Sequence, residues 1–149
     1  MSWKDLVWTR CDPPIDDSAV REIESTLGKR FPEEFVECIK QCHGGTPSRN
    51  SFRFEDGKGE MGSCLAFLLS FLPGKDEGIL DCIDLLEDQL PSGLVPFGED
   101  AGGDCICFDY NNLGENGSPQ IVYWHHEKPV HESVTFLTTD FVSFISMLE

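Results

Sequence analysis

The chain has 149 residues, of which 40% are hydrophobic, and its 27 acidic and 11 basic residues give a formal net charge of −16. A chain of this length forms one domain that buries roughly 70% of the surface of its unfolded state, so neither disorder nor a disulfide-stapled mini-protein is expected. The longest nearly apolar run, 64–72, is too short for a membrane span, and residues 1–8 lack a secretory signal pattern; we therefore expect one soluble, cytoplasmic domain over residues 1–149.

The charge is concentrated in the second half of the chain. Residues 1–75 carry 12 acidic and 10 basic side chains, whereas residues 76–149 carry 15 acidic side chains and one base, Lys128. Proteins that bind nucleic acid or anionic membranes need basic residues to neutralise phosphate, so both are excluded as direct partners. A basic protein fits this charge distribution, because complementary potentials accelerate association. A role of the acidic residues in solubility alone stays open.

The seven cysteines are odd in number and mostly have apolar neighbours, a pattern typical of reduced thiols in a core. They are Cys11, Cys38, Cys42, Cys64, Cys82, Cys105 and Cys107. Two pairs could be metal ligands, with a histidine completing a zinc site, because their spacing places both thiols on one face of an element. They are Cys38 with Cys42 on a helix and Cys105 with Cys107 on a strand. Structural zinc sites usually contain a CxxC pair, which this chain lacks, so we expect neither metal nor cofactor.

The first half of the chain predicts two helices followed by the start of a sheet. A helix over residues 17–28 is indicated by capping oxygens at residues 16–18 and by Gly28. A second helix is expected from Pro32 to the glycines at 44–45. Alternating Phe52 and Phe54 and the apolar run 65–72 are typical of strands.

The second half predicts a third helix, four strands and a final helix. Helical periodicity covers residues 76–93 and leaves an acidic outer face. The expected strands are Leu94–Phe97, Asp104–Tyr110, Gln120–His125 and Val134–Leu137, and the last helix begins near Asp140. Because the strand over 104–110 is apolar on both faces, it should be central and covered by helices. We predict an α+β domain with a mainly antiparallel sheet of about five or six strands and helices packed against it.

The turn between the first two of these strands is rich in glycine and acid. Gly102 and Gly103 lie between strands without a lysine, so they do not form a phosphate-binding loop. The acids at 99, 100, 104 and 109 offer oxygen ligands, but their spacing matches no EF-hand. No metal site is therefore predicted at this turn.

No catalytic residue is predicted. The chain lacks a GxSxG nucleophile motif, and its cysteines have no recognisable Cys/His signature. His125 and His126 end a predicted strand beside Glu127, which makes a general base conceivable. Paired histidines at a strand end are more often hydrogen-bonding or contact residues, so an enzymatic role is the weakest interpretation.

The order of four segments resembles the SUKH superfamily, which includes a yeast cell-wall synthesis regulator and many small bacterial immunity proteins. The segments are RFPEEFVECIKQCHGG, LVPFGEDAGGDCICFDY, QIVYWHHE and TTDFVSFISMLE. The resemblance spans nearly the whole chain, and residues 96–109 are its most specific part. It implies an α+β fold, no known enzymatic activity and no required cofactor. The chain is similar to the bacterial branch, whose common role is to bind and neutralise a toxin.

The resemblance and the charge together predict an immunity protein whose acidic face occludes a basic toxin domain, expected to be a nuclease. The residues expected to contact this partner are Glu99, Asp100, Asp104, Asp109, Glu115, Trp124, His126 and Glu127. For Asp104 a second role stays open, because its side chain can instead brace the glycine turn through backbone hydrogen bonds. The competing function is an intracellular scaffold or signalling adaptor, as in the yeast relative.

Overall fold

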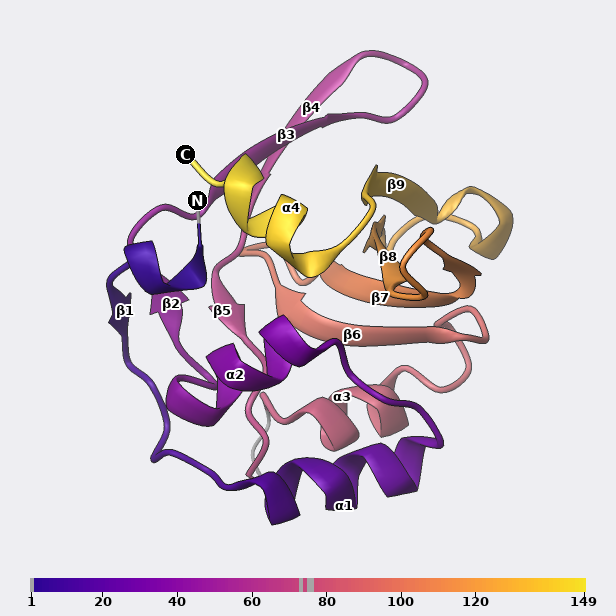
Figure 1. Ribbon diagram of the computed structural model, residues 1–149. Coiled ribbons are helices and arrows are strands. Elements are labelled where there is room, and N and C mark those ends of the chain that lie inside the picture. Colours follow the sequence, from indigo (N-terminus) through magenta and orange to yellow (C-terminus); the bar gives the residue numbers. More distant parts are fainter. Residues whose placement is uncertain (1, 73, 75–76) are drawn as a thin grey trace.

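The computed structural model describes residues 2–72, 74 and 77–149. Its centre is a five-stranded antiparallel sheet in the order β5-β6-β7-β8-β9, accompanied by the two-stranded ribbons β1–β2 and β3–β4 (Figure 1). The elements are η1 (Trp3–Asp5), β1 (Trp8–Thr9), α1 (Asp17–Leu27), α2 (Glu33–Gln41), β2 (Thr46–Pro47), β3 (Ser51–Glu55), β4 (Glu60–Cys64), β5 (Phe67–Leu68), α3 (Ile79–Leu85), β6 (Leu94–Glu99), β7 (Cys105–Leu113), β8 (Pro119–Trp124), η2 (Val130–Glu132), β9 (Val134–Thr138) and α4 (Phe141–Met147). The predicted α+β class is confirmed, and β7 is the central strand.

The helix ends follow local capping chemistry. Asp16 accepts a hydrogen bond from the Ala19 amide at the start of α1, and Gly28 ends this helix in the left-handed conformation, with φ 67°. Asp140 caps α4 in the same way as Asp16 caps α1. The third helix is shorter than the predicted span 76–93, whose first residue lies outside the described residues. The acidic residues at 84, 87 and 88 are repelled by the negative C-terminal end of the helix dipole. This repulsion favours an end of the helix at Leu85.

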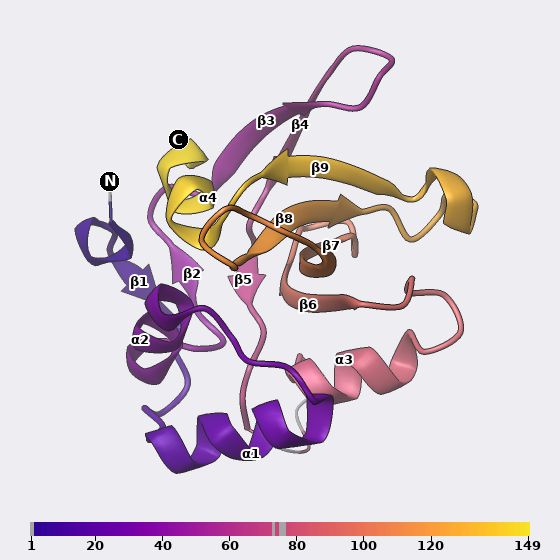
Figure 2. The ribbon, with the colours of Figure 1, turned by 45° about the vertical axis from the view of Figure 1, so that its right-hand side comes forward.

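One face of the sheet carries an aromatic core. Phe35 of α2 is fully buried, and its ring centroid lies 5.0 Å from that of Phe108 on β7 and 5.2 Å from that of Phe141 on α4. Phe97 stacks on Phe108 at 4.3 Å, and Phe144 contacts Phe97 from α4. Helices α2 and α4 therefore cover this face, which is consistent with their positions in Figures 1 and 2.

Helix α3 covers part of the opposite face. Cys105 and Ile106 are neighbours on β7, so their side chains point to opposite sides of the sheet. Phe108, on the same side as Ile106, packs against α2, whereas Cys105 contacts Cys82 of α3. The sheet is thus enclosed between α2 and α4 on one side and α3 on the other, which explains why β7 is apolar on both faces.

The prediction of seven reduced thiols is wrong for two of them, because Cys11 and Cys42 form a disulfide. Their approach follows from the pairing of β1 with β2 and from the hydrogen bond of the Asp12 amide to the His43 carbonyl, at 2.9 Å. These contacts bring residues 31 positions apart to a Cα–Cα separation of 4.9 Å. Gly45 packs against both sulfurs, and a Cβ there would lie 2.4 Å from the sulfur of Cys42. The other five cysteines are free, and all except Cys64 are buried.

We predict that Phe35→Ala lowers the free energy of unfolding by about 3–5 kcal/mol, because it leaves a cavity among at least three aromatic rings. Val142→Ala on the exposed side of α4 is the matched control, with a cost below about 1 kcal/mol. Urea denaturation monitored by circular dichroism measures both values. Equal losses in the two variants would contradict the placement of Phe35 at the core centre.

Candidate functional site

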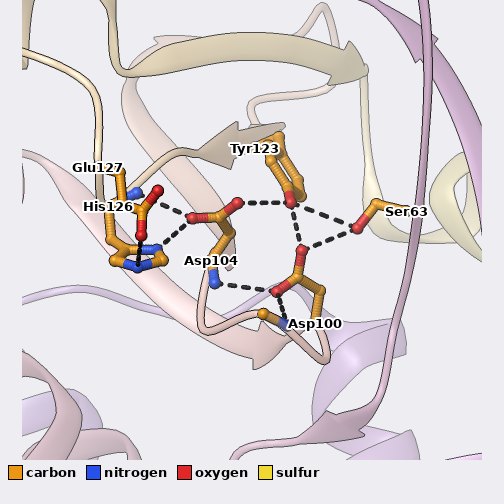
Figure 3. A network of polar contacts seen from close by, with 7 residues as sticks. Ser63, Asp100, Asp104, Tyr123, His126 and Glu127 are labelled. Carbon is orange, nitrogen blue, oxygen red and sulfur yellow. Dashed lines mark hydrogen bonds and ion pairs between the residues drawn. The ribbon is translucent and has the colours of Figure 1, made fainter.

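A polar network connects the β6–β7 turn to the end of β8 (Figure 3). Asp100 organises the turn, since its Oδ1 accepts hydrogen bonds from the backbone amides of Gly102 and Asp104, each at 2.9 Å. Gly103 occupies the left-handed region at φ 93°, which a glycine tolerates without strain. The alternative role considered for Asp104, bracing the glycine turn, therefore belongs to Asp100.

Asp104 connects the turn to β8. Its Oδ1 accepts a hydrogen bond from the His126 amide at 2.9 Å and pairs with the Nδ1 of the same residue. Its Oδ2 accepts a hydrogen bond from the Tyr123 hydroxyl at 2.8 Å. The Nε2 of His126 lies 3.5 Å from the exposed carboxylate of Glu127. Asp104 thus fixes both the backbone and the imidazole at the end of β8.

The Tyr123 hydroxyl lies between the two aspartates. It contacts Asp100 Oδ2 as well as Asp104 Oδ2, and the Ser63 hydroxyl of β4 donates to Asp100 Oδ2 at 2.9 Å (Figure 3). A tyrosine hydroxyl has one proton, so the two carboxylates share one phenolic donor. Burial and the hydrogen bond to Asp100 both raise the pKa of Tyr123, so the phenol keeps this proton at neutral pH.

The pKa values of Asp104 and His126 shift in opposite directions. Burial alone would raise the pKa of Asp104, but the hydrogen bonds donated by His126 and Tyr123 outweigh it and leave this pKa below its usual value. The hydrogen bond to Asp104 raises the pKa of His126. The geometry therefore favours an aspartate–imidazolium pair, in which Asp104 retains its negative charge.

Further carboxylates border this network. Glu99 is half-buried at the end of β6, and its pKa is raised by burial and then by the nearby charges of Glu77 and Asp100. We use the name acidic edge for five residues: Glu77, Glu99, Asp100, Asp104 and Glu127. Glu77 and Glu127 are exposed and the other three are half-buried, so the acidic edge presents carboxylates to solvent.

The remaining predicted contact residues do not belong to this exposed surface. Asp109 is buried, and it accepts hydrogen bonds from the Asn111 amide and the Asn112 side chain. Trp124 is only 1% exposed, so it is a core residue and not a surface anchor. Glu115 is exposed, but it follows the C-terminal end of β7, whereas the β6–β7 turn precedes this strand. The nine residues of β7 separate the two by about 30 Å. The structure therefore brings together Glu99, Asp100, Asp104, His126 and Glu127 at one surface. Trp124 lies beneath this surface, Asp109 is buried, and Glu115 is remote.

The two adjacent histidines occupy different environments. His125 is buried against Tyr123, with ring centroids 4.6 Å apart, whereas His126 lies toward Trp124 and is partly exposed. Burial lowers the pKa of His125, and the charge of Lys128 contributes in the same direction. Their opposite orientations follow from strand alternation, and the two rings do not act on one common substrate position.

Sequence reasoning missed Ser63 and the bridging role of Tyr123. Ser63 belongs to β4, a strand whose sequence EMGSC has no apolar alternation, and it is 37 residues before Asp100. No local pattern indicates such a contact. The sequence gives a weak indication of the role of Tyr123, because a tyrosine within an apolar strand needs a hydrogen-bond partner for its hydroxyl.

The comparisons with known proteins identify the family. The family model described as "SMI1 / KNR4 family (SUKH-1)" matches residues 14–147, so the chain belongs to this family. One relative is the "SPbeta prophage-derived uncharacterized protein YokK" of Bacillus subtilis (strain 168), which is 23% identical over 124 residues. This match covers 72% of the present chain and 60% of the relative, so the chain spans less than two thirds of that protein. Within the described residues, no helix has the length and apolar character needed to cross a membrane.

We predict that Tyr123→Phe destabilises the fold by about 1–3 kcal/mol, because it removes the donor between two half-buried carboxylates. Tyr110→Phe is the matched control, since the Tyr110 hydroxyl donates one hydrogen bond to the Arg30 carbonyl and its loss costs about 0.5–1.5 kcal/mol. Chemical denaturation at neutral pH measures both variants. A Tyr123→Phe variant as stable as the wild type would contradict the bridging role.

A second prediction concerns pH. Since the folded-state pKa of His126 lies above its usual 6.5, protonated His126 stabilises the fold fully below about pH 6.5, and this contribution is lost as pH rises through the folded-state value. Asp104, with a lowered pKa, contributes above its usual 3.8 and loses its contribution as pH falls through its folded-state value. The pair is therefore most stabilising between about pH 4 and pH 6.5.

The variant His126→Gln tests this window. It should be less stable than the wild type at pH 5.5 by less than about 1 kcal/mol, because the His126 side chain is 35% exposed and solvent screens the pair. The difference should decrease at alkaline pH. His131→Gln, at a side chain that is 80% exposed, is the control for replacing a surface histidine and should change the stability by less than about 0.5 kcal/mol. A constant difference for His126→Gln across this range would exclude the imidazolium pair.

Proposed function

We propose that this chain is an immunity protein that binds a basic toxin domain through the acidic edge and blocks its action by stoichiometric occlusion. The observation that best supports this proposal is the hydrogen-bonded arrangement of Asp100, Asp104 and Tyr123, which holds the two carboxylates in place before any partner binds. Membership of the SUKH-1 family supports this role, since neutralisation of toxins is the common role of its bacterial branch. The prophage origin of the relative YokK is consistent with it.

The physical advantage of this arrangement is preorganisation. The network fixes the carboxylates through backbone amides and a buried phenol, so their ordering costs little free energy during binding. Exposed Glu77 and Glu127 extend the negative potential and accelerate the encounter with a cationic surface. A nuclease cleft that accepts phosphate is such a surface, and the acidic edge would occupy it in place of the nucleic acid.

The chain performs no chemistry in this proposal, and binding alone neutralises the partner. The partner tested first is the C-terminal domain of the polypeptide encoded beside this gene, when that domain is short and basic. Calorimetry should give a one-to-one complex whose affinity decreases as salt rises. Coexpression with the present chain should restore the growth of cells that produce the domain.

We predict that Glu127→Gln weakens this complex about two- to fivefold at low salt, mainly through slower association. Glu115→Gln changes the net charge by the same amount, but residue 115 lies beyond the opposite end of β7. This variant should therefore bind the partner with the affinity of the wild type. Surface plasmon resonance at several salt concentrations measures both variants. A loss confined to Glu115→Gln, or an affinity independent of salt, would contradict the acidic edge as the binding surface. A salt-independent complex that still neutralises the toxin would preserve the immunity role.

A further inference from the structure

Three potential metal ligands from three different elements converge at the acidic edge, to which one of them belongs. They are Cys82 of α3, Glu99 of β6 and Cys105 of β7, and their ligand atoms all lie within 4.8 Å of one another. Cys82 Sγ is 3.9 Å from Glu99 Oε1. Glu99 and Cys105 are paired residues in the β6–β7 ladder, so the sheet itself holds two of the three ligands in position.

The spacing of these atoms suits a tetrahedral zinc site. Zinc binds cysteine sulfur at about 2.3 Å and carboxylate oxygen at about 2.0–2.2 Å, which places two tetrahedral ligands about 3.5–3.8 Å apart. The observed 3.9 Å between Cys82 Sγ and Glu99 Oε1 needs only a small side-chain adjustment to reach this range. Thiolates also select zinc over magnesium or calcium, which prefer oxygen ligands alone.

We propose that Cys82, Glu99 and Cys105 bind one Zn²⁺ ion. Both cysteines are buried, with exposed fractions of 4% and 0%, and the half-buried Glu99 lies at the solvent side of the cluster. Cys107 lies on the same face of β7 as Cys105 but outside this group of ligand atoms, so water is the expected fourth ligand. Binding converts two thiols to thiolates and releases two protons, while the Glu99 carboxylate coordinates without further exchange.

The site differs from the zinc pairs that the sequence offers. Cys42 is bound to Cys11 and is therefore not a ligand, and the third ligand comes from α3, which no spacing within the strand region indicates. A zinc ion here would attach α3 to the base of the β6–β7 turn. The inference does not rest on the proposed function, although Glu99 also belongs to the acidic edge, because metal binding is measured without any partner protein.

The test uses the full chain, purified under anaerobic conditions without a thiol reductant so that the Cys11–Cys42 disulfide stays intact, stripped with a chelator, and titrated with Co²⁺ as a spectroscopic probe for Zn²⁺. One equivalent should produce thiolate-to-cobalt charge-transfer absorption and the visible bands of tetrahedral cobalt. One equivalent of Zn²⁺ should displace the cobalt, and the metal should raise the Tm of the chain. Absence of thiolate absorption in the folded protein would overturn the proposal.

Single variants identify the ligands. Cys82→Ser and Cys105→Ser should each lose the charge-transfer absorption or weaken metal binding at least tenfold, and Glu99→Gln should weaken it while retaining both thiolates. Cys64→Ser, at the half-buried free cysteine of β4, is the matched control and should bind as the wild type does. Circular dichroism confirms that each variant is folded. Binding that depends on Cys64 but not on Cys82, or a native disulfide between Cys82 and Cys105 in a non-reducing peptide map, would contradict the site.

Discussion

The contact on which the site depends is the sharing of the Tyr123 hydroxyl between Asp100 and Asp104. Asp100 is committed to the backbone of the turn and Asp104 to the end of β8, so the phenol connects two separately anchored carboxylates. Two acids placed this close repel each other when no donor separates them. The aromatic core beneath makes the arrangement possible, because Tyr123 packs against Phe54 at 4.9 Å and keeps its hydroxyl at the rim of the sheet.

This construction explains how an acidic surface coexists with a stable fold. Self-repulsion among surface charges destabilises a compact protein, and this chain carries a net charge of −16. At the acidic edge, backbone amides, a serine hydroxyl and one imidazole supply hydrogen-bond donors to the carboxylates. The acidic edge thereby keeps its negative potential, while the free-energy cost of the repulsion between its carboxylates is reduced.

The fold was more accessible from the sequence than the site. Capping residues such as Asp16 and Gly28, and the apolar run that marks β8, act over a few residues and can therefore be recognised locally. The β3–β4 ribbon shows the limit, because half of it lacks an apolar pattern and is defined only by its pairing with the other strand. The same holds for the Cys11–Cys42 disulfide, which depends on the pairing of β1 with β2.

The site combines residues from distant positions in the sequence, and for this reason composition selected only part of it. The sequence indicated the acidic turn and His126 as candidates. It also indicated Asp109 and Trp124, because the burial of these two residues within the sheet cannot be recognised from the sequence.

The most direct test of the account is hydrogen–deuterium exchange of the chain alone and in complex with its basic partner. The account predicts new protection at residues 99–104 and 124–127. Protection confined to residues 1–50, with the acidic edge unchanged, would contradict it.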